Sequence, residues 1–134
     1  SKRADIFAMA DSRDRVVRIE VKCSGQRKWL IGTRGASPPT QESSRVRWVL
    51  VHVPPPPQGV PSSDDERGRA APRFFVLTPR QLFKIFRQGA NEYGAKYFAR
   101  HGRRFTGRGV PNVSLAAVEQ YEGAWESMLS LLAK

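Results

Sequence analysis

Three side chains near the start of the sequence, Asp5, Glu20 and Lys22, have the types and spacing of a site for a divalent cation. Residues 16–23 carry β-branched side chains at four of eight positions, which predicts a β-strand. Side chains alternate between the two faces of a strand, so Glu20 and Lys22 should share one face. Residues 4–9, which include Asp5, also predict a strand. Two carboxylates and an amine on neighbouring strands could hold a hard cation and act on a bound water.

The register between these two strands decides whether Asp5 reaches Glu20. Residues 11–14 are a polar, turn-forming cluster, so the two strands should form a hairpin. In a hairpin centred on that cluster, the apolar pairs are Ile6 with Ile19 and Ala8 with Val17. The same register places Asp5 opposite Glu20, and paired Cβ atoms lie about 4.5–5.5 Å apart. Two carboxylates at that distance repel each other unless a cation such as Mg²⁺ lies between them.

The other face of the second strand is apolar and predicts the side that is turned toward a core. Its members are Val17, Ile19, Val21 and Cys23. We therefore expect Cys23 to be a buried structural thiol. Because it is the single cysteine, it cannot form an internal disulfide, which is compatible with a reducing cytoplasm.

Asp5 followed by Glu20-Val21-Lys22 resembles the D…(D/E)-x-K core of the PD-(D/E)XK nuclease superfamily, which has the restriction-endonuclease-like fold. The order of the residues, their hairpin-length spacing and their strand context agree with that pattern. The resemblance implies an α/β fold with a central mixed sheet of about five strands flanked by helices. That fold usually begins with a helix that carries another acid. The sequence has no counterpart to it before Asp5, so we expect a version of the fold that lacks this first helix.

The resemblance also implies a function, namely a metal-dependent nuclease that hydrolyses phosphodiester bonds, with DNA as the favoured substrate. The implied cofactor is Mg²⁺ or Mn²⁺, held by the carboxylates of Asp5 and Glu20 and by the backbone carbonyl of Val21. Lys22 would orient or deprotonate the attacking water, or stabilise charge in the transition state. The implied catalytic residues are Asp5, Glu20 and Lys22.

Two other functions are compatible with the same residues. One is a non-catalytic nucleic-acid-binding module on the same fold, which the missing acid of the first helix favours. The other is a basic interaction domain in which Asp5 and Glu20 pair with Lys22 and Arg18 as surface ions. Metal binding distinguishes the nuclease from both of these alternatives.

The charge of the chain favours a polyanionic partner. There are 23 Lys and Arg residues against 12 Asp and Glu, which gives a formal net charge of +11. Cations that neutralise phosphates release counterions and so gain affinity for nucleic acid. A solvated basic surface is the alternative explanation. The candidates for contacts with nucleic acid are Lys2, Arg3, Arg27, Lys28, Arg34, Arg103 and Arg104.

The remaining elements follow from apolar periodicity and from capping residues. Further strands are predicted over residues 26–32, 45–53 and 73–77, and the second of these is apolar enough to be central and covered on both sides. A helix should begin with Thr78 as N-cap and end at Gly89, with a second short helix over 91–101. A last helical region should be capped by Ser114 and broken at Gly123. Trp29 should pack in the core, and His52 should be hydrogen-bonded at a strand end.

The 134 residues suit a single nuclease-like domain over 1–134, with a flexible loop at about 54–72 that follows four consecutive prolines. No apolar run is long enough to cross a membrane, and no signal peptide is visible. A cytoplasmic location is therefore expected. Without the first helix, one face of the sheet would be exposed, which suggests a homodimer.

Overall fold

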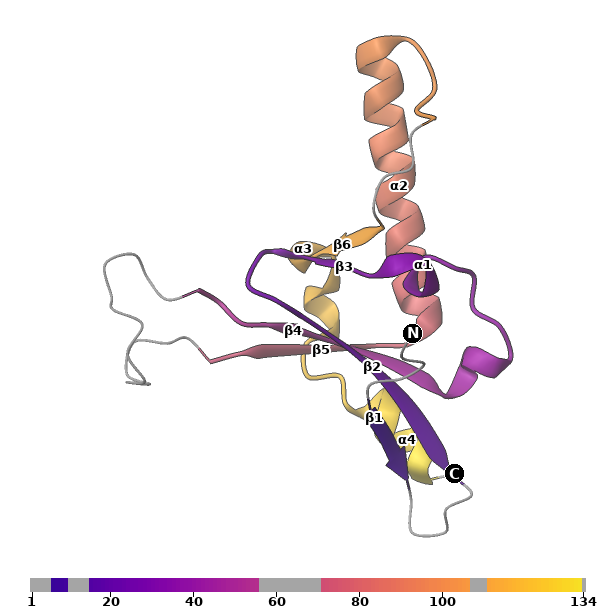
Figure 1. Cartoon of the computed structure of the whole chain (residues 1–134), viewed down its shortest axis with the longest axis vertical. Helices are drawn as coiled ribbons and strands as arrows, with labels where there is room; N and C mark the ends of the chain where they lie inside the picture. Colours follow the sequence, from indigo (N-terminus) through magenta and orange to yellow (C-terminus); the bar gives the residue numbers. More distant parts are fainter. Residues whose placement is uncertain (1–5, 10–14, 56–70, 107–110, 134) are drawn as a thin grey trace.

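A four-stranded mixed sheet lies at the centre of the computed structural model, which describes residues 6–9, 15–55, 71–106 and 111–133 (Figure 1). The strands follow the order β1-β2-β4-β5, with bounds Ile6–Met9, Val16–Ser24, Val46–His52 and Arg73–Leu77. The central pair β2–β4 is parallel, and the two outer pairs are antiparallel. The predicted α/β class is confirmed.

The hairpin of β1 and β2 has the register that the sequence predicts. Ile6 pairs with Ile19 and Ala8 pairs with Val17. A slip of one residue would have moved every side chain of β1 to the other face. Asp5, the acid expected opposite Glu20, lies outside the described residues.

Strand β4 is buried at all seven positions because the sheet has a core on each face. Trp48 and Leu50 lie in the larger core, together with Phe75, Leu77 and Leu82. Val49 and Val51 lie in the smaller one, with Val17, Ile19, Val76 and Met128. The prediction of a central strand covered on both sides is therefore confirmed.

Helix α2, Pro79–His101, begins as predicted but continues much further. Thr78 is the N-cap in a capping box, because its hydroxyl accepts from the Gln81 N–H at 3.1 Å and the Gln81 side chain accepts from the Thr78 N–H at 2.9 Å. The predicted stop at Gly89 is wrong, and so is the separate second helix. The helix ends at Gly102, whose φ of 67° is left-handed. A glycine commonly ends a helix by adopting that conformation, whereas Gly89 keeps a helical one.

A second, two-stranded sheet takes the place of a fifth central strand. Strand β3, Lys28–Leu30, pairs with β6, Asn112–Ser114, a strand that the sequence did not predict. Both edges of β2 are already paired, with β1 and β4, so β3 cannot join next to it. Trp29 is buried as predicted, and its indole Nε1 donates to the Val51 carbonyl at 3.0 Å.

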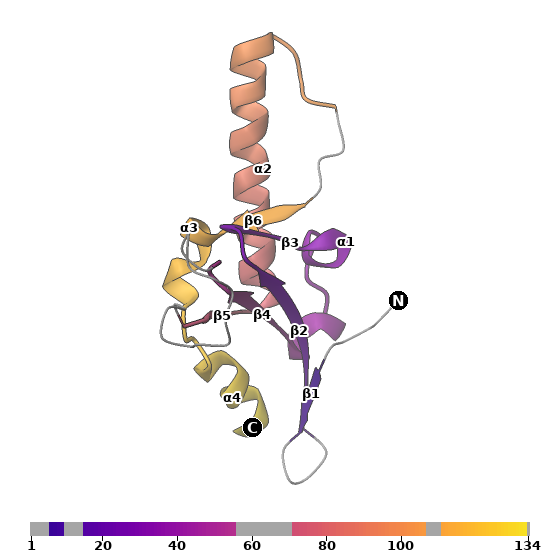
Figure 2. The ribbon, with the colours of Figure 1, turned by 60° about the vertical axis from the view of Figure 1, so that its left-hand side comes forward.

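The C-terminal segment runs along the sheet from α3 to α4 (Figure 2) and contributes to both cores, with Leu115 and Val118 in the larger one and Met128 in the smaller one. Ser114 caps α3, Leu115–Val118, by accepting from the Ala117 N–H at 3.3 Å, and the 3₁₀ helix η3, Glu119–Tyr121, follows. Gly123, at φ 66°, then breaks the helical path before α4, Glu126–Ala133. Both the predicted cap and the predicted break are confirmed.

Two arginines attach α4 to the start of β4. Arg47 is buried, and its Nε donates to the Ser127 carbonyl at 3.1 Å. Arg45 donates from Nη2 to the Leu131 carbonyl at 3.2 Å. Burial lowers the pKa of Arg47, and the charge of Arg45 lowers it further. Several carbonyl acceptors compensate for the burial of the guanidinium.

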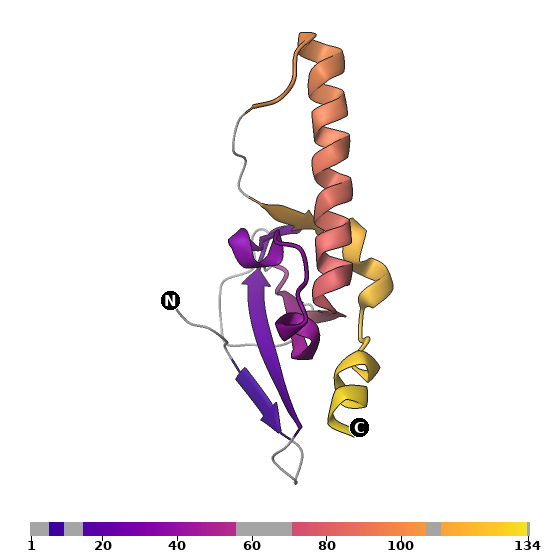
Figure 3. The same ribbon diagram turned by 90° about the vertical axis from the view of Figure 1, so that its right-hand side faces the viewer.

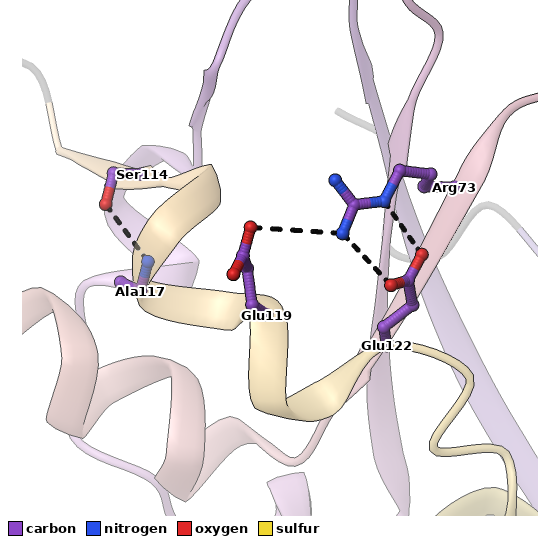
Figure 4. A network of polar contacts seen from close by, with 5 residues as sticks. All are labelled: Arg73, Ser114, Ala117, Glu119 and Glu122. Atoms are coloured by element: carbon purple, nitrogen blue, oxygen red, sulfur yellow. Dashed lines mark hydrogen bonds and ion pairs between the residues drawn. The ribbon is translucent and has the colours of Figure 1, made fainter. Parts of the chain in front are cut away.

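Arg73 joins β5 to the segment around η3 in a network of exposed charges (Figure 4). Its Nε and Nη2 lie 2.8 and 3.0 Å from the two carboxylate oxygens of Glu122. Glu119 is more distant, with 3.9 Å between its Oε1 and Arg73 Nη2.

No helix in the described part of the chain is long and apolar enough to cross a membrane.

Candidate active site

Glu20 carries a carboxylate that is buried on one face of the central sheet. It lies in the middle of β2 and is only 7% exposed. In the register of β2 and β4, Glu20 pairs with Trp48 and Lys22 pairs with Leu50. Both side chains therefore lie on one face of β2, as the alternation predicted. That face is turned toward the larger core, whereas the sequence predicted the core on the opposite face alone. Lys22 is half-buried.

The buried carboxylate has a cationic partner that the sequence did not predict. Arg34 Nη1 donates to Glu20 Oε1 at 2.8 Å. Arg34 belongs to α1, Gly32–Gly35, a short helix that follows β3 in the chain, within a stretch that the sequence predicted as loop (Figure 3). Arg34 was predicted to contact nucleic acid, and its side chain keeps 48% of its surface exposed.

Helix α1 is held in place by close packing. A Cβ added to Gly35 would lie 2.8 Å from Ile31 Cβ and 3.1 Å from Leu82 Cδ2, so only a glycine fits there. The Ile31 N–H donates to the Pro111 carbonyl at 3.0 Å, next to β6. Arg34 therefore reaches Glu20 from a turn that β3, β6 and α2 support together. Two glycines in four residues gave no helical signal in the sequence.

The described residues supply only part of a metal site. They contain no group of three or more His, Cys, Asp or Glu side chains that could hold an ion. Glu20 provides one carboxylate, and Val21, whose main-chain carbonyl the resemblance implied as a ligand, is the next residue of β2. A site with two carboxylates requires Asp5, which lies outside the described part of the chain.

The other residues predicted to bind nucleic acid are dispersed. Arg27 and Lys28 are exposed at the start of β3, and Arg103 and Arg104 are exposed after the end of α2. The end of α2 lies far from β2 in all three views (Figures 1–3). Lys2 and Arg3 fall outside the described residues. The fold therefore keeps Arg103 and Arg104 away from the strand that carries Glu20.

Three sequence predictions near this site need correction. Cys23 is exposed, because it lies about 13 Å along β2 from Ile19, which packs against the smaller core. His52 is buried beside Trp29, but its Nδ1 has no hydrogen-bond partner among the described residues. Glu20 is not a surface ion, since it is buried in the sheet and bonded to Arg34.

A basic groove on α2 is a feature that the sequence analysis did not identify. It is an open depression of about 570 Å³ lined by Arg80, Phe83, Lys84, Arg87, Gln88, Asn91 and Glu92. Its residues recur at three- and four-residue steps, which would have been the signal for one exposed face of a helix. The groove contains three cations, and Glu20 is not part of its lining.

Comparisons with known proteins found no match, so a function for this chain has to be argued from its own residues. No protein-family model matches the sequence, no curated protein is significantly similar to it, and no solved structure is significantly similar to its fold.

Proposed function

We propose that this chain is a metal-dependent nuclease that hydrolyses phosphodiester bonds, with DNA as the favoured substrate and a restriction-endonuclease-like fold. The observation that carries the proposal is the placement of Glu20 and Lys22 on one face of β2, inside a hairpin with the predicted register. The net charge of +11 supports a polyanionic substrate.

The burial of Glu20 is a further reason to assign it a function. A carboxylate inside a sheet costs free energy unless charges and hydrogen bonds compensate for it. An apolar residue at this position of β2 would pack against Trp48 without that cost. A chain that retains an acid in its core is therefore expected to use it.

In this proposal, Asp5, Glu20 and the backbone carbonyl of Val21 hold Mg²⁺ or Mn²⁺. When bound, the metal would supply Lewis-acid chemistry at the phosphate. Lys22, two residues from Glu20 on the same face, would orient the attacking water, accept its proton or stabilise the charge that develops on the phosphate. Arg34 neutralises Glu20 and competes with a cation for its Oε1.

A second candidate is a nucleic-acid-binding module without catalysis. The bond between Arg34 and Glu20 favours it, because the guanidinium already satisfies the buried carboxylate. In that case Glu20 positions α1, and the basic residues bind the partner. The two candidates differ in whether Glu20 binds a metal.

Calorimetric titration with Mg²⁺ and with Mn²⁺ tests the proposal, using the wild type, Glu20→Ala and Asp5→Ala. Glu92→Ala is a matched control, since Glu92 is an exposed acid on α2. We expect the wild type and the control to bind metal and to cleave DNA in its presence, and both site variants to lose binding and cleavage. Circular dichroism verifies that each variant is folded. Absence of metal binding in the wild type would contradict the nuclease and leave the binding module, which salt-dependent affinity for nucleic acid then tests.

A further inference from the structure

Helix α2 continues well beyond the core (Figure 1). Its end carries an aromatic cluster. The Gly102 N–H donates to the Phe98 carbonyl at 2.8 Å, and its left-handed conformation turns the chain back along the helix. This turn brings Phe105 edge-on to Tyr93 and Tyr97, with ring centroids 5.0 and 5.1 Å apart. The helix and the returning segment therefore form one surface.

The rings of this cluster keep part of their surface in contact with solvent. Tyr93 is 54% exposed and Phe105 is 37% exposed. Contacts among the rings hold the returning segment to the helix, but they cover less than half of Tyr93. Exposed aromatic surface at the end of a projecting element is typical of an interaction site.

The charges around the rings indicate the chemistry of the partner. Residues 93–106 contain no acidic residue. They contain four exposed cations, namely Lys96, Arg100, Arg103 and Arg104. Partly exposed rings surrounded by arginines and lysines match a partner that combines flat apolar groups with phosphates.

We propose that this surface, the α2 tip, binds unpaired nucleotides by stacking bases on its rings while its cations contact the phosphates. The α2 tip is made of Tyr93, Lys96, Tyr97, Arg100, Arg103, Arg104 and Phe105. A duplex buries the faces of its bases in its own stack, so aromatic stacking selects single strands or unpaired segments. The inference rests on nucleic acid as the partner in the proposed function, but not on catalysis.

The test measures the affinity of the full chain for a fluorescein-labelled oligothymidylate and for a labelled duplex, by anisotropy at several salt concentrations with EDTA present. Tyr93→Leu keeps an apolar side chain but removes the π-face, and Tyr93→Trp restores a larger one. Phe7→Leu is the matched control, because Phe7 is an aromatic residue, 59% exposed, on β1. Thermal unfolding verifies that the variants are folded.

We expect Tyr93→Leu to weaken binding of the single strand by roughly 5- to 100-fold without changing its salt dependence. Tyr93→Trp should retain the affinity, and Phe7→Leu should bind like the wild type. In the double variant Arg103→Gln/Arg104→Gln, the slope of log K against log salt should become shallower by roughly 0.7 for each phosphate that is no longer neutralised.

Three results would overturn the proposal. The first is equal binding by Tyr93→Leu and the wild type, and the second is tighter binding of the duplex than of the single strand. The third concerns polyglutamate, used as a competitor of the oligonucleotide. If Tyr93→Leu weakens the binding of polyglutamate as much as it weakens the binding of the oligonucleotide, the partner would be an acidic protein.

The outcome is separate from that of the nuclease proposal. If Tyr93→Leu binds normally while the wild type cleaves DNA with Mg²⁺, the α2 tip proposal is wrong and the nuclease stands. If the wild type takes up no metal while Tyr93→Leu loses affinity for the single strand, the α2 tip stands and the nuclease is wrong. Absence of all binding to nucleic acid would contradict both.

Discussion

Arg34 Nη1 lies 2.8 Å from Glu20 Oε1, and this bond joins a four-residue helix to the middle of the central sheet. It neutralises a carboxylate that the fold would otherwise bury alone. The two partners differ in exposure, with 48% of the Arg34 side chain and 10% of the Glu20 side chain in contact with solvent. Arg34 can therefore leave the pair for water or a phosphate, whereas Glu20 has to find another cation.

Loss of the arginine should destabilise the fold through the charge that it leaves behind. We expect Arg34→Gln to lower the free energy of unfolding by about 1–3 kcal/mol, because a buried charged acceptor loses its donor. Urea unfolding measures the change. In the double variant Arg34→Gln/Glu20→Gln most of the loss should be recovered, since no charge remains buried. A double variant less stable than Arg34→Gln would show that the pair is not the cause.

Lys22 should be needed for cleavage but not for metal binding. Replacement by Met keeps most of the aliphatic stem beside Leu50 and removes the amine. If Lys22 acts on the attacking water, Lys22→Met should lower the rate of cleavage by about 10²–10⁴-fold. Metal affinity, measured by calorimetry, should not decrease. Unchanged cleavage would exclude Lys22 from the reaction and leave it as a flanking residue of β2.

Two glycines should respond in opposite ways to replacement by alanine. Gly35→Ala would place its Cβ 2.8 Å from Ile31 Cβ, and overpacking of this kind costs about 1–3 kcal/mol. Gly89→Ala meets no heavy atom within 4 Å of the new Cβ and lies inside α2, so it should stabilise the protein by about 0.5–1 kcal/mol. Thermal and urea unfolding of the two variants give the comparison. Destabilisation by Gly89→Ala would contradict a continuous α2.

The ion pair of Arg73 and Glu122 should contribute stability that depends on pH. The hydrogen bond from Arg73 lowers the pKa of Glu122 below its ordinary value of 4.5, and the charge of Arg73 lowers it further. A carboxyl group with a depressed pKa stabilises the fold above its unfolded pKa, and this contribution disappears as the pH falls through the folded value.

Unfolding of the wild type and of Glu122→Gln across acidic pH tests this dependence. The wild type should be more stable at neutral pH, and the difference should shrink below the ordinary carboxyl pKa. A difference that stays constant down to the lowest pH would show that the ionised form of Glu122 is not its cause. Glu126→Gln is a control, because Glu126 is an exposed acid in the first turn of α4.

The sequence by itself determined the features that depend on neighbours along the chain. The alternation in β2 assigned Glu20 and Lys22 to one face, and the polar turn assigned the register of Ile6 with Ile19. Capping chemistry located the starts of α2 and α3 at Thr78 and Ser114. These features follow from side-chain period and local hydrogen bonds, which a stretch of sequence contains in full.

Only the tertiary structure decided which distant groups meet. The pairing of β3 with β6 joins residues 82 to 86 positions apart in the sequence, and no local pattern specifies a partner at that distance. Gly89 keeps a helical conformation, so α2 continues past it. Gly102 adopts the left-handed conformation, and there the chain turns back onto Tyr93 and Tyr97. Arg34 reaches Glu20 because Gly35 packs between Ile31 and Leu82. The residue types of the candidate site are visible in the sequence, but the electrostatic partner of Glu20 is a consequence of packing.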